Sequence, residues 1–246
     1  MIRTVWTWTF FVLWTGVMSV VALTASLLTL GMARHRLAGA LAPIWARPLF
    51  FAAGITIRYQ GLEHIADRKA RVMVMNHAST LDVLLVCALG PPGLCPLVKK
   101  ELMYIPVMNV VFWALGGQFV DRGNSEAAVQ SAIRLGETMR REQLTAVVAP
   151  EGTRSLNGEL QRFKLGAFHM AHTAGAEIVP LVIHGAHQLF KPREWTVRPG
   201  EVVAEIRQAV TIPQGADIRE FASGMHDSYQ GWLDKGPPQT AAQLAA

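Results

Sequence analysis

The sequence predicts an α/β fold, in which a largely parallel, mixed sheet is flanked by helices and preceded by an N-terminal membrane-anchoring helical segment. Two observations lead to this prediction. From residue 54 onward, short apolar or alternating runs typical of strands alternate with longer helical patterns, and this alternation is typical of a parallel sheet covered by helices. Before that point, the thirty residues 4–33 contain no charged side chain.

The overall composition limits the class of protein and of partner. The chain has 246 residues, of which 51% are hydrophobic and only 17% are charged, enough for one sizeable core and an additional apolar segment. The net charge of +5 favours anionic partners. Because the basic residues are scattered, we expect no nucleic acid partner and favour a membrane surface or a phosphorylated substrate. The two cysteines, Cys87 and Cys95, are expected to be reduced packing residues.

The uncharged run 4–33 is longer than the roughly 20 residues that cross a bilayer core. Trp6, Trp8 and Trp14 lie in its first half, as aromatic residues do at a membrane interface. A secretory signal is the alternative, because Ala38-Gly39-Ala40 resembles a cleavage site. The apolar run is about twice as long as in such signals, so we expect an anchor that either spans the bilayer or lies in its interface.

Charge is asymmetric across this anchor. One arginine, Arg3, precedes it, and three follow it: Arg34, Arg36 and Arg47. Positive residues tend to remain on the cytoplasmic side, so we expect a membrane protein with the bulk of its chain on the cytoplasmic face.

A second apolar helix is expected over residues 37–53, interrupted by Pro43 and Pro48. It carries a charge and is too short to cross a bilayer, so it is expected to lie on the membrane. Residues 1–53 are therefore predicted to form the membrane anchor.

Residues 54–233 are predicted to form the α/β domain, and the Pro- and Ala-rich tail 234–246 is expected to be disordered. The expected strands cover 55–59, 70–75, 94–98, 118–120, 144–149, 178–184, 194–198 and 201–207. The expected helices cover 80–89, 104–115, 125–141, 164–174 and 217–233.

The first candidate site is the segment Asn76–Asp82, between an expected strand and an expected helix. If His77 lies in the turn, Asp82 in the first helical turn can accept a hydrogen bond from the N–H of one ring nitrogen. The other ring nitrogen is then free to take a proton from a hydroxyl. The alternative is structural: Ser79 and Asp82 also fit a capping box, which would leave His77 an ordinary loop residue.

The second candidate site, Pro150–Ser155, also follows an apolar strand. Ligands of α/β sheets bind beyond the carboxyl ends of strands, where Glu151 would lie near His77. Gly152 allows a sharp turn, and Arg154 offers a fork of donors suited to phosphate. The alternative is a polar surface turn. A further arginine, Arg122, follows another expected strand in Gly117–Arg122.

These segments closely resemble the 1-acylglycerol-3-phosphate O-acyltransferase family. Four blocks match in order: Asn-His-x-x-x-x-Asp at 76–82, Gly-x-Phe-x-x-Arg at 117–122, Pro-Glu-Gly-Thr-Arg-Ser at 150–155 and a hydrophobic proline block at 178–181. By this resemblance, His77 is the general base and Asp82 orients it. The resemblance also implies the substrate-binding residues: Lys100 and Arg154 for the phosphate, Arg122 beside them, Glu151 for the glycerol, and Gly152 and Thr153 in the same turn. One departure lies in the segment Pro106–Asn109, where the family usually has a glycine. This difference concerns the shape of the tunnel that would hold the acyl chain.

The resemblance implies transfer of a fatty acyl group from an acyl thioester to the free hydroxyl of a lysophospholipid, which converts 1-acylglycerol-3-phosphate to phosphatidic acid. No cofactor and no metal are expected. Acyl-CoA or acyl carrier protein would supply the thioester, and membrane lipids would be partners. A lyso-aminolipid is the alternative acceptor.

Two other enzyme classes are weaker alternatives. A serine hydrolase is suggested by Gly123–Ala127, which differs from a nucleophile elbow at its fifth residue. A zinc hydrolase is disfavoured because the pairs His169/His172 and His184/His187 lack the glutamate of the zinc motif.

Overall fold

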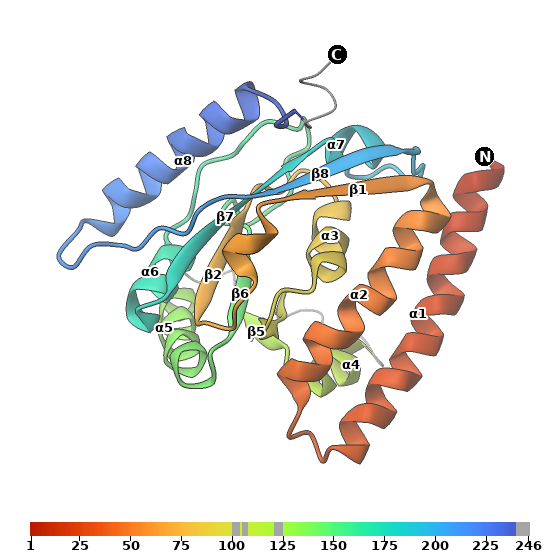
Figure 1. The fold of residues 1–246 in the computed structure, drawn as a ribbon, viewed down its shortest axis with the longest axis horizontal. Coiled ribbons are helices and arrows are strands. Elements are labelled where there is room, and N and C mark those ends of the chain that lie inside the picture. Colours follow the sequence, from red (N-terminus) through yellow and green to blue (C-terminus); the bar gives the residue numbers. More distant parts are fainter. Residues whose placement is uncertain (100–103, 105–107, 121–124, 240–246) are drawn as a thin grey trace.

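The computed structural model describes residues 1–99, 104, 108–120 and 125–239, and its centre is a six-stranded sheet (Figure 1). The strand order is β1 (Ile55–Gln60), β8 (Gly200–Ile206), β7 (Glu177–His184), β2 (Arg71–Met75), β6 (Thr145–Val148) and β3 (Leu94–Cys95). Neighbouring strands run parallel except β7 and β8, which are antiparallel. The predicted largely parallel, mixed sheet is therefore confirmed.

Two predicted strands differ from the structure. The strand expected over 94–98 is divided at Pro96, and its second part, β4 (Leu97–Lys99), pairs with β5 (Gln118–Val120) in a separate two-stranded sheet. The strand expected over 194–198 is wrong, because this segment is a loop. Its backbone groups bond locally and to a side chain: Arg198 N–H donates to Leu189, and the Trp195 carbonyl accepts from Trp8. No ladder partner remains for these groups.

Helices cover both faces of the sheet (Figure 1). One face carries α3 (Leu81–Leu89), α2 (Arg34–Ala53) and, outside them, α1 (Ile2–Leu28); the other carries α5 (Ser125–Glu142), α6 (Gly166–Ala174) and α8 (Ile218–Asp234). The remaining short helices are η1 (Leu62–Ile65), α4 (Met108–Ala114) and α7 (Ala186–Leu189). Side chains alternate between two cores: Met73 packs with α2 and α3, whereas Val72 and Val74 pack with α5, α6 and α8. This burial on both faces explains why β2 is apolar from Val72 to Met75.

The expectation that α2 is interrupted by its prolines is wrong. The helix runs without a break from Arg34 to Ala53 and contains both prolines. A proline inside a helix removes one backbone hydrogen bond, so the surrounding packing must compensate. Pro43 packs against Gly90, where an added Cβ would lie 2.3 Å from the proline Cγ, and Arg47 Nε donates to the Ala88 carbonyl at 3.0 Å. Both contacts hold α2 against the end of α3.

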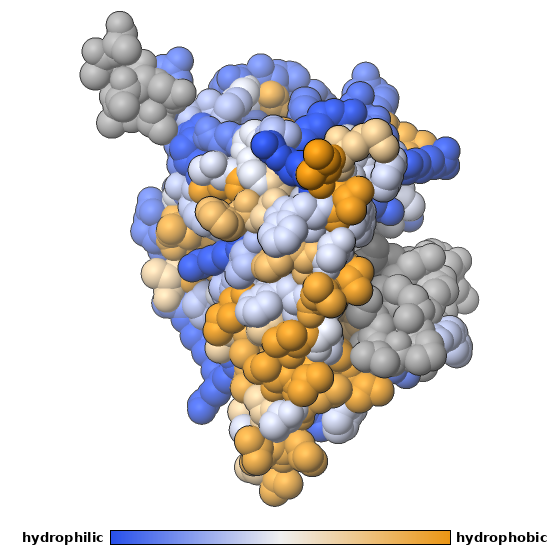
Figure 2. Space-filling model, turned by 90° about the vertical axis from the view of Figure 1, so that its right-hand side faces the viewer, coloured by the Kyte–Doolittle hydropathy of each residue, from blue (hydrophilic) through white to orange (hydrophobic). Residues whose placement is uncertain are grey.

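The uncharged N-terminal run forms α1, which is shorter than the expected 4–33 because the helix ends at Leu28. One side of α1 is attached to the rest of the protein through tryptophans: Trp14 Nε1 donates to the Trp45 carbonyl at 2.9 Å, and Trp8 Nε1 donates to the Trp195 carbonyl at 2.8 Å. The other side exposes apolar side chains, seen as a hydrophobic band in Figure 2. By length and composition α1 could cross a membrane.

Candidate functional site

The candidate site is built on the turn between β2 and α3. The strand ends at Met75 and the helix begins at Leu81, so His77 lies before the helix. This position allows its ring to reach the first helical turn, and His77 Nδ1 lies 2.9 Å from Asp82 Oδ2. Asp82 is buried, while the His77 side chain is 13% exposed. An ionised carboxylate accepts hydrogen bonds only, so the contact fits the His77 tautomer with its proton on Nδ1, in which Nε2 carries the lone pair.

The same carboxylate oxygen also holds the backbone of the turn. Asp82 Oδ2 accepts hydrogen bonds from the N–H groups of Ala78 at 2.8 Å and Ser79 at 2.7 Å. Ser79 Oγ accepts from Leu81 N–H and donates to the Phe190 carbonyl. Asp82 therefore satisfies backbone donors, as a cap does, and also contacts the imidazole. The capping interpretation and the histidine–acid interpretation apply to the same side chain.

The second predicted segment, Pro150–Ser155, is bonded to the backbone of His77 on both sides. Glu151 Oε1 accepts from His77 N–H at 2.7 Å, and Ser155 N–H donates to the His77 carbonyl at 2.8 Å. β2 and β6 are parallel neighbours, so their carboxyl ends bring the two segments to the same edge of the sheet. Hydrogen bonds from the segment that carries Arg154 thus hold His77 in position.

Glu151 is a buried carboxylate that connects three segments. Its second oxygen accepts from Gln161 N–H at 3.0 Å. Burial raises the pKa of the Glu151 carboxyl to about 7, although the hydrogen bonds from His77 and Gln161 oppose this shift. The contacts of Glu151 position the backbone around His77.

Asn76 is a positioning residue to which the sequence analysis gave no role. Its side-chain amide makes two hydrogen bonds with the backbone of Ile183 on β7, donating to the carbonyl at 3.0 Å and accepting from the N–H at 2.8 Å. These bonds extend the pairing of β2 with β7 by one residue and hold His77 at the end of the strand. Its position in the block Asn76–Asp82 was the sequence signal that could have identified it.

The phosphate-binding residues implied by the resemblance are only partly described. Lys100 and Arg122 lie outside the residues that the structure describes, as do Pro106 and Val107 and part of the serine hydrolase segment Gly123–Ala127. Thr153 and Arg154 are exposed, and one Arg154 guanidinium nitrogen donates to Thr80 Oγ1. Because Thr80 lies between His77 and Asp82, this contact places the arginine next to the histidine turn.

Lys164 is a cation that the sequence analysis missed. A Cβ added at Gly152 would lie 2.7 Å from Lys164 Nζ, so the lysine ammonium lies directly against this glycine. Gly152 has a φ of +78°, a backbone conformation that favours glycine. The contact joins positions that are twelve apart in sequence, and no local pattern indicated it.

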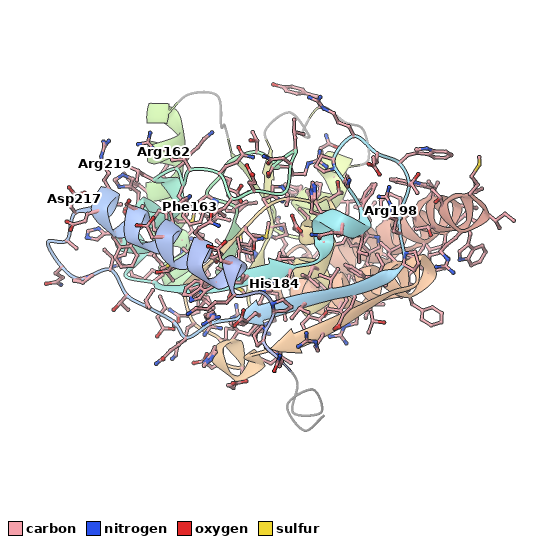
Figure 3. All side chains as sticks on the ribbon, turned by 90° about the horizontal axis from the view of Figure 1, so that it is seen from above. Arg162, Phe163, His184, Arg198, Asp217 and Arg219 are labelled. Atoms are coloured by element: carbon pink, nitrogen blue, oxygen red, sulfur yellow. The ribbon has the colours of Figure 1, made fainter. Side chains whose placement is uncertain are left out.

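Two surface cavities lie away from these residues. One, of about 380 Å³, is lined by the segment after Gln161 and by the start of α8; its lining residues are Arg162, Phe163, Leu165, Arg219, Ala222, Ser223 and His226. Figure 3 shows Arg162 and Arg219 beside the N-terminal end of α8, with Arg198 on the opposite side toward α1. The other cavity, of about 290 Å³, lies near the turn between α1 and α2. Of the predicted site residues that the structure describes, none lines either cavity.

Comparisons with known proteins show what this chain is similar to. The family model described as Acyltransferase matches residues 56–184. The chain is 30% identical over 178 residues to the 1-acyl-sn-glycerol-3-phosphate acyltransferase of Limnanthes douglasii, a match that covers 72% of this chain and 63% of that protein. It is 26% identical over 185 residues to the enzyme of the same name from Haemophilus influenzae, covering 74% and 76% of the two chains. The matched region thus spans somewhat less than two thirds of the length of the plant relative.

The fold is shared with a solved structure. The crystal structure of the 1-acyl-sn-glycerophosphate acyltransferase PlsC from Thermotoga maritima superposes with a TM-score of 0.75 at 22% identity and covers 97% of both chains. At this identity the match concerns the fold, including the N-terminal helices.

Proposed function

Because the chain belongs to the acyltransferase family, as the four sequence blocks predicted, we propose that it transfers a fatty acyl group from an acyl thioester to the free hydroxyl of lysophosphatidic acid. The product is phosphatidic acid. The observation that carries the proposal is the contact of 2.9 Å between His77 Nδ1 and Asp82 Oδ2, which leaves Nε2 as a free base at the carboxyl end of β2. The relatives from Limnanthes douglasii and Haemophilus influenzae are named for this acceptor.

The proposed reaction needs one base and no acyl-enzyme. His77 Nε2 takes the proton of the acceptor hydroxyl as its oxygen attacks the thioester carbonyl. The new carbon–oxygen bond forms, the tetrahedral intermediate collapses, and the carbon–sulfur bond breaks with the electron pair leaving on sulfur. The imidazolium then returns its proton to the thiolate. Asp82 stabilises the imidazolium, and because its carboxylate oxygen is already held by two backbone N–H groups, it needs no rearrangement to do so.

Substrate positioning is assigned to the cations at the same edge of the sheet. Arg154 would bind the acceptor phosphate, and the family resemblance adds Lys100 and Arg122. Glu151, Gly152 and Thr153 form the turn that carries the arginine. Holding the phosphate fixes the nearby hydroxyl relative to His77, and such positioning can contribute on the order of 7–11 kcal/mol in favourable cases.

We also assign a membrane location. The exposed apolar side of α1 includes Val12, Leu13 and Val17 and would lie in the lipid (Figure 2), while its tryptophan side keeps the catalytic part at the membrane surface. The arginines after α1 favour the cytoplasmic face. Deleting residues 1–33 should release the protein from liposomes in a flotation assay. Flotation equal to that of the full chain would contradict this location.

A matrix of donors and acceptors on purified protein tests the activity. Acyl-CoA and acyl carrier protein thioesters are each combined with lysophosphatidic acid, a lyso-aminolipid and water as acceptors, without added metal. Transfer to lysophosphatidic acid is the expected result. Transfer to the lyso-aminolipid alone would show that this lipid, and not lysophosphatidic acid, is the acceptor. Hydrolysis of the thioester without transfer would support the serine hydrolase alternative.

A further inference from the structure

The turn Glu151–Ser155 contains two backbone donors without a described acceptor. Gly152 N–H donates to Ala149 and Ser155 N–H donates to His77, but the N–H groups of Thr153 and Arg154 donate to no carbonyl or side chain among the described residues. Both residues are exposed. Gly152 has a φ of +78°, and consecutive N–H groups that follow such a residue form a concavity suited to an anion.

The ammonium of Lys164 borders this same turn. A Cβ at Gly152 would lie 2.7 Å from Lys164 Nζ, 3.0 Å from Cε and 3.1 Å from Cδ, so the end of the side chain extends over the glycine. Residues two apart in sequence have Cα atoms no more than about 7 Å apart, which places the ammonium and the Arg154 backbone on neighbouring parts of the turn. The lack of a side chain at position 152 provides the space for the ammonium.

The backbone of Lys164 is held where this contact requires it. Lys164 N–H donates to the Pro150 carbonyl at 2.8 Å, and Gln161 N–H donates to Glu151 Oε2 at 3.0 Å. Two hydrogen bonds thus attach the segment 161–164 to the turn 150–152. The same turn holds the backbone of His77, so the position of the ammonium is coupled to the position of the proposed base.

The charge of Lys164 is not neutralised by the described residues. Its side chain is exposed, and none of the salt bridges between described residues involves it. The nearest carboxylate along the turn, Glu151, directs one oxygen to His77 N–H and the other to Gln161 N–H. The ammonium therefore lies beside a turn whose N–H groups at Thr153 and Arg154 have no acceptor among the described residues, and such donors favour a phosphate monoester.

From this geometry we propose that Lys164 is a further binding residue for the phosphate of the lysophospholipid acceptor, acting together with the N–H groups of Thr153 and Arg154. This inference rests on the proposed acyltransferase function and deepens it. A short glycerol backbone separates the phosphate from the reacting hydroxyl, so a cation attached to the His77 turn controls the distance between the hydroxyl and the base. Lys164 does not take part in the proton transfer.

Steady-state kinetics of Lys164→Met test the proposal, because methionine retains most of the apolar stem and removes the charge. The KM for lysophosphatidic acid should rise about tenfold to a hundredfold, the range expected for loss of one charge-assisted contact. The kcat and the KM for the acyl donor should stay within about threefold. Lys164→Arg should retain most of the acceptor affinity. Lys235→Met, which changes an exposed lysine at the end of α8, is the matched control and should behave as the wild type.

Two further measurements separate this role from a structural one. With monoacylglycerol, which lacks the phosphate, the rates of wild type and Lys164→Met should be equal. Titration calorimetry with glycerol 3-phosphate should show weaker binding to Lys164→Met than to the wild type and the Lys235→Met control, and this comparison requires no turnover.

The outcomes distinguish the inference from the proposed function. An unchanged KM for lysophosphatidic acid and unchanged glycerol 3-phosphate binding in Lys164→Met would overturn the inference and leave the acyltransferase activity intact. A rise confined to the KM for acyl-CoA would assign Lys164 to a phosphate of the donor and would overturn it equally. A wild type that acylates no lysolipid would refute the proposed function, while the calorimetric comparison would still decide whether Lys164 binds a phosphate monoester.

Discussion

Two of the histidine–carboxylate pairs among the described residues, His77 with Asp82 and His184 with Glu205, have buried carboxylates but differ in their surroundings. His77 and Asp82 lie at the turn after β2, with Nδ1 2.9 Å from Asp82 Oδ2. His184, the last residue of β7, has its Nε2 3.3 Å from Oε2 of Glu205 on the antiparallel strand β8. Both carboxylates are buried and both histidine side chains are mostly buried. Proximity of a histidine to an acid therefore does not distinguish the two pairs.

The carboxylates are held by different partners. Asp82 accepts from two backbone N–H groups of its own turn, whereas Glu205 is paired with Arg207 at 2.6 Å. Arg207 in turn lies over the Trp232 ring of α8 at 4.7 Å, and Figure 3 shows His184 close to that helix. The second pair thus belongs to the packing of α8 on the sheet. A candidate base requires a turn at the carboxyl edge of parallel strands with cations nearby, and only the first pair has both.

The largest expected effect comes from replacing each histidine. His77→Ala should lower kcat about a thousandfold, within the range for loss of a general base, while the protein remains folded and binds liposomes. His184→Gln should retain kcat within about threefold. Rate measurements on variants with matching circular dichroism spectra check this. Comparable losses in the two variants would remove the distinction between the pairs.

Asp82→Asn should reduce kcat by on the order of a hundredfold or more, because the amide cannot stabilise the imidazolium as a carboxylate does. The matched control is Asp217→Asn at the start of α8. Asp217 also accepts from two backbone N–H groups, those of Arg219 and Glu220, but contacts no histidine among the described residues. Asp217→Asn should cost about 1 kcal/mol of stability and leave kcat unchanged. If Asp82→Asn lost only stability, the aspartate would be a cap alone.

Arg154→Ala should raise the KM for lysophosphatidic acid about tenfold to a hundredfold, since charge-assisted contacts are worth roughly 1.5–3 kcal/mol each. Arg154→Lys should recover only part of this loss, because an ammonium cannot reproduce the planar fork. Kinetics with each substrate varied separately provide the measurement. Equal KM values for the wild type and Arg154→Ala would exclude this arginine from phosphate recognition.

Glu151 should make the stability of the protein depend on pH. Burial raises the pKa of its carboxyl from 4.5 to about 7 in the folded protein, so the folded state binds more protons than the unfolded state between these values. The free energy of unfolding should therefore fall as pH rises from about 4.5 to about 7, by on the order of 2 kcal/mol. Denaturant titrations at several pH values should show this slope in the wild type and a flatter slope in Glu151→Gln. The same slope in both proteins would contradict the assignment.

The titration of His184 should have the smallest effect on the free energy of unfolding, and the sign of this effect is opposite to that of Glu151. Burial lowers the pKa of its imidazole below 6.5, against the influence of Glu205, so the unfolded state binds more protons in that range. This contribution to the free energy of unfolding is fully present above pH 6.5 and is lost as pH falls. His184→Gln should remove this acid-side loss without altering the slope assigned to Glu151. Denaturant titrations below pH 6.5 that showed an equal loss in both proteins would contradict this.

Much of the fold could be predicted from local pattern. The strands expected over 70–75, 144–149 and 178–184 matched β2, β6 and β7 closely, because strands buried on both faces are largely apolar. Boundaries depended on tertiary contacts. Prolines at 43 and 48 predicted interruptions, yet α2 is continuous where Pro43 packs on Gly90. The loop 194–198 has a strand-like sequence, but its backbone groups bond to α1 and to neighbouring residues.

By itself, the sequence determined the family and the residues at the carboxyl ends of β2 and β6, because the spacing within Asn76–Asp82 and Pro150–Ser155 is local and can be read along the chain. Only the tertiary structure decided how these segments meet: Glu151 and Ser155 bond to the backbone of His77, Asn76 bonds to Ile183, and Lys164 lies over Gly152. The physical reason is that parallel strands bring their carboxyl ends together from distant parts of the chain. A contact between residues far apart in sequence leaves no periodic pattern in a single sequence, so only the folded backbone reveals it.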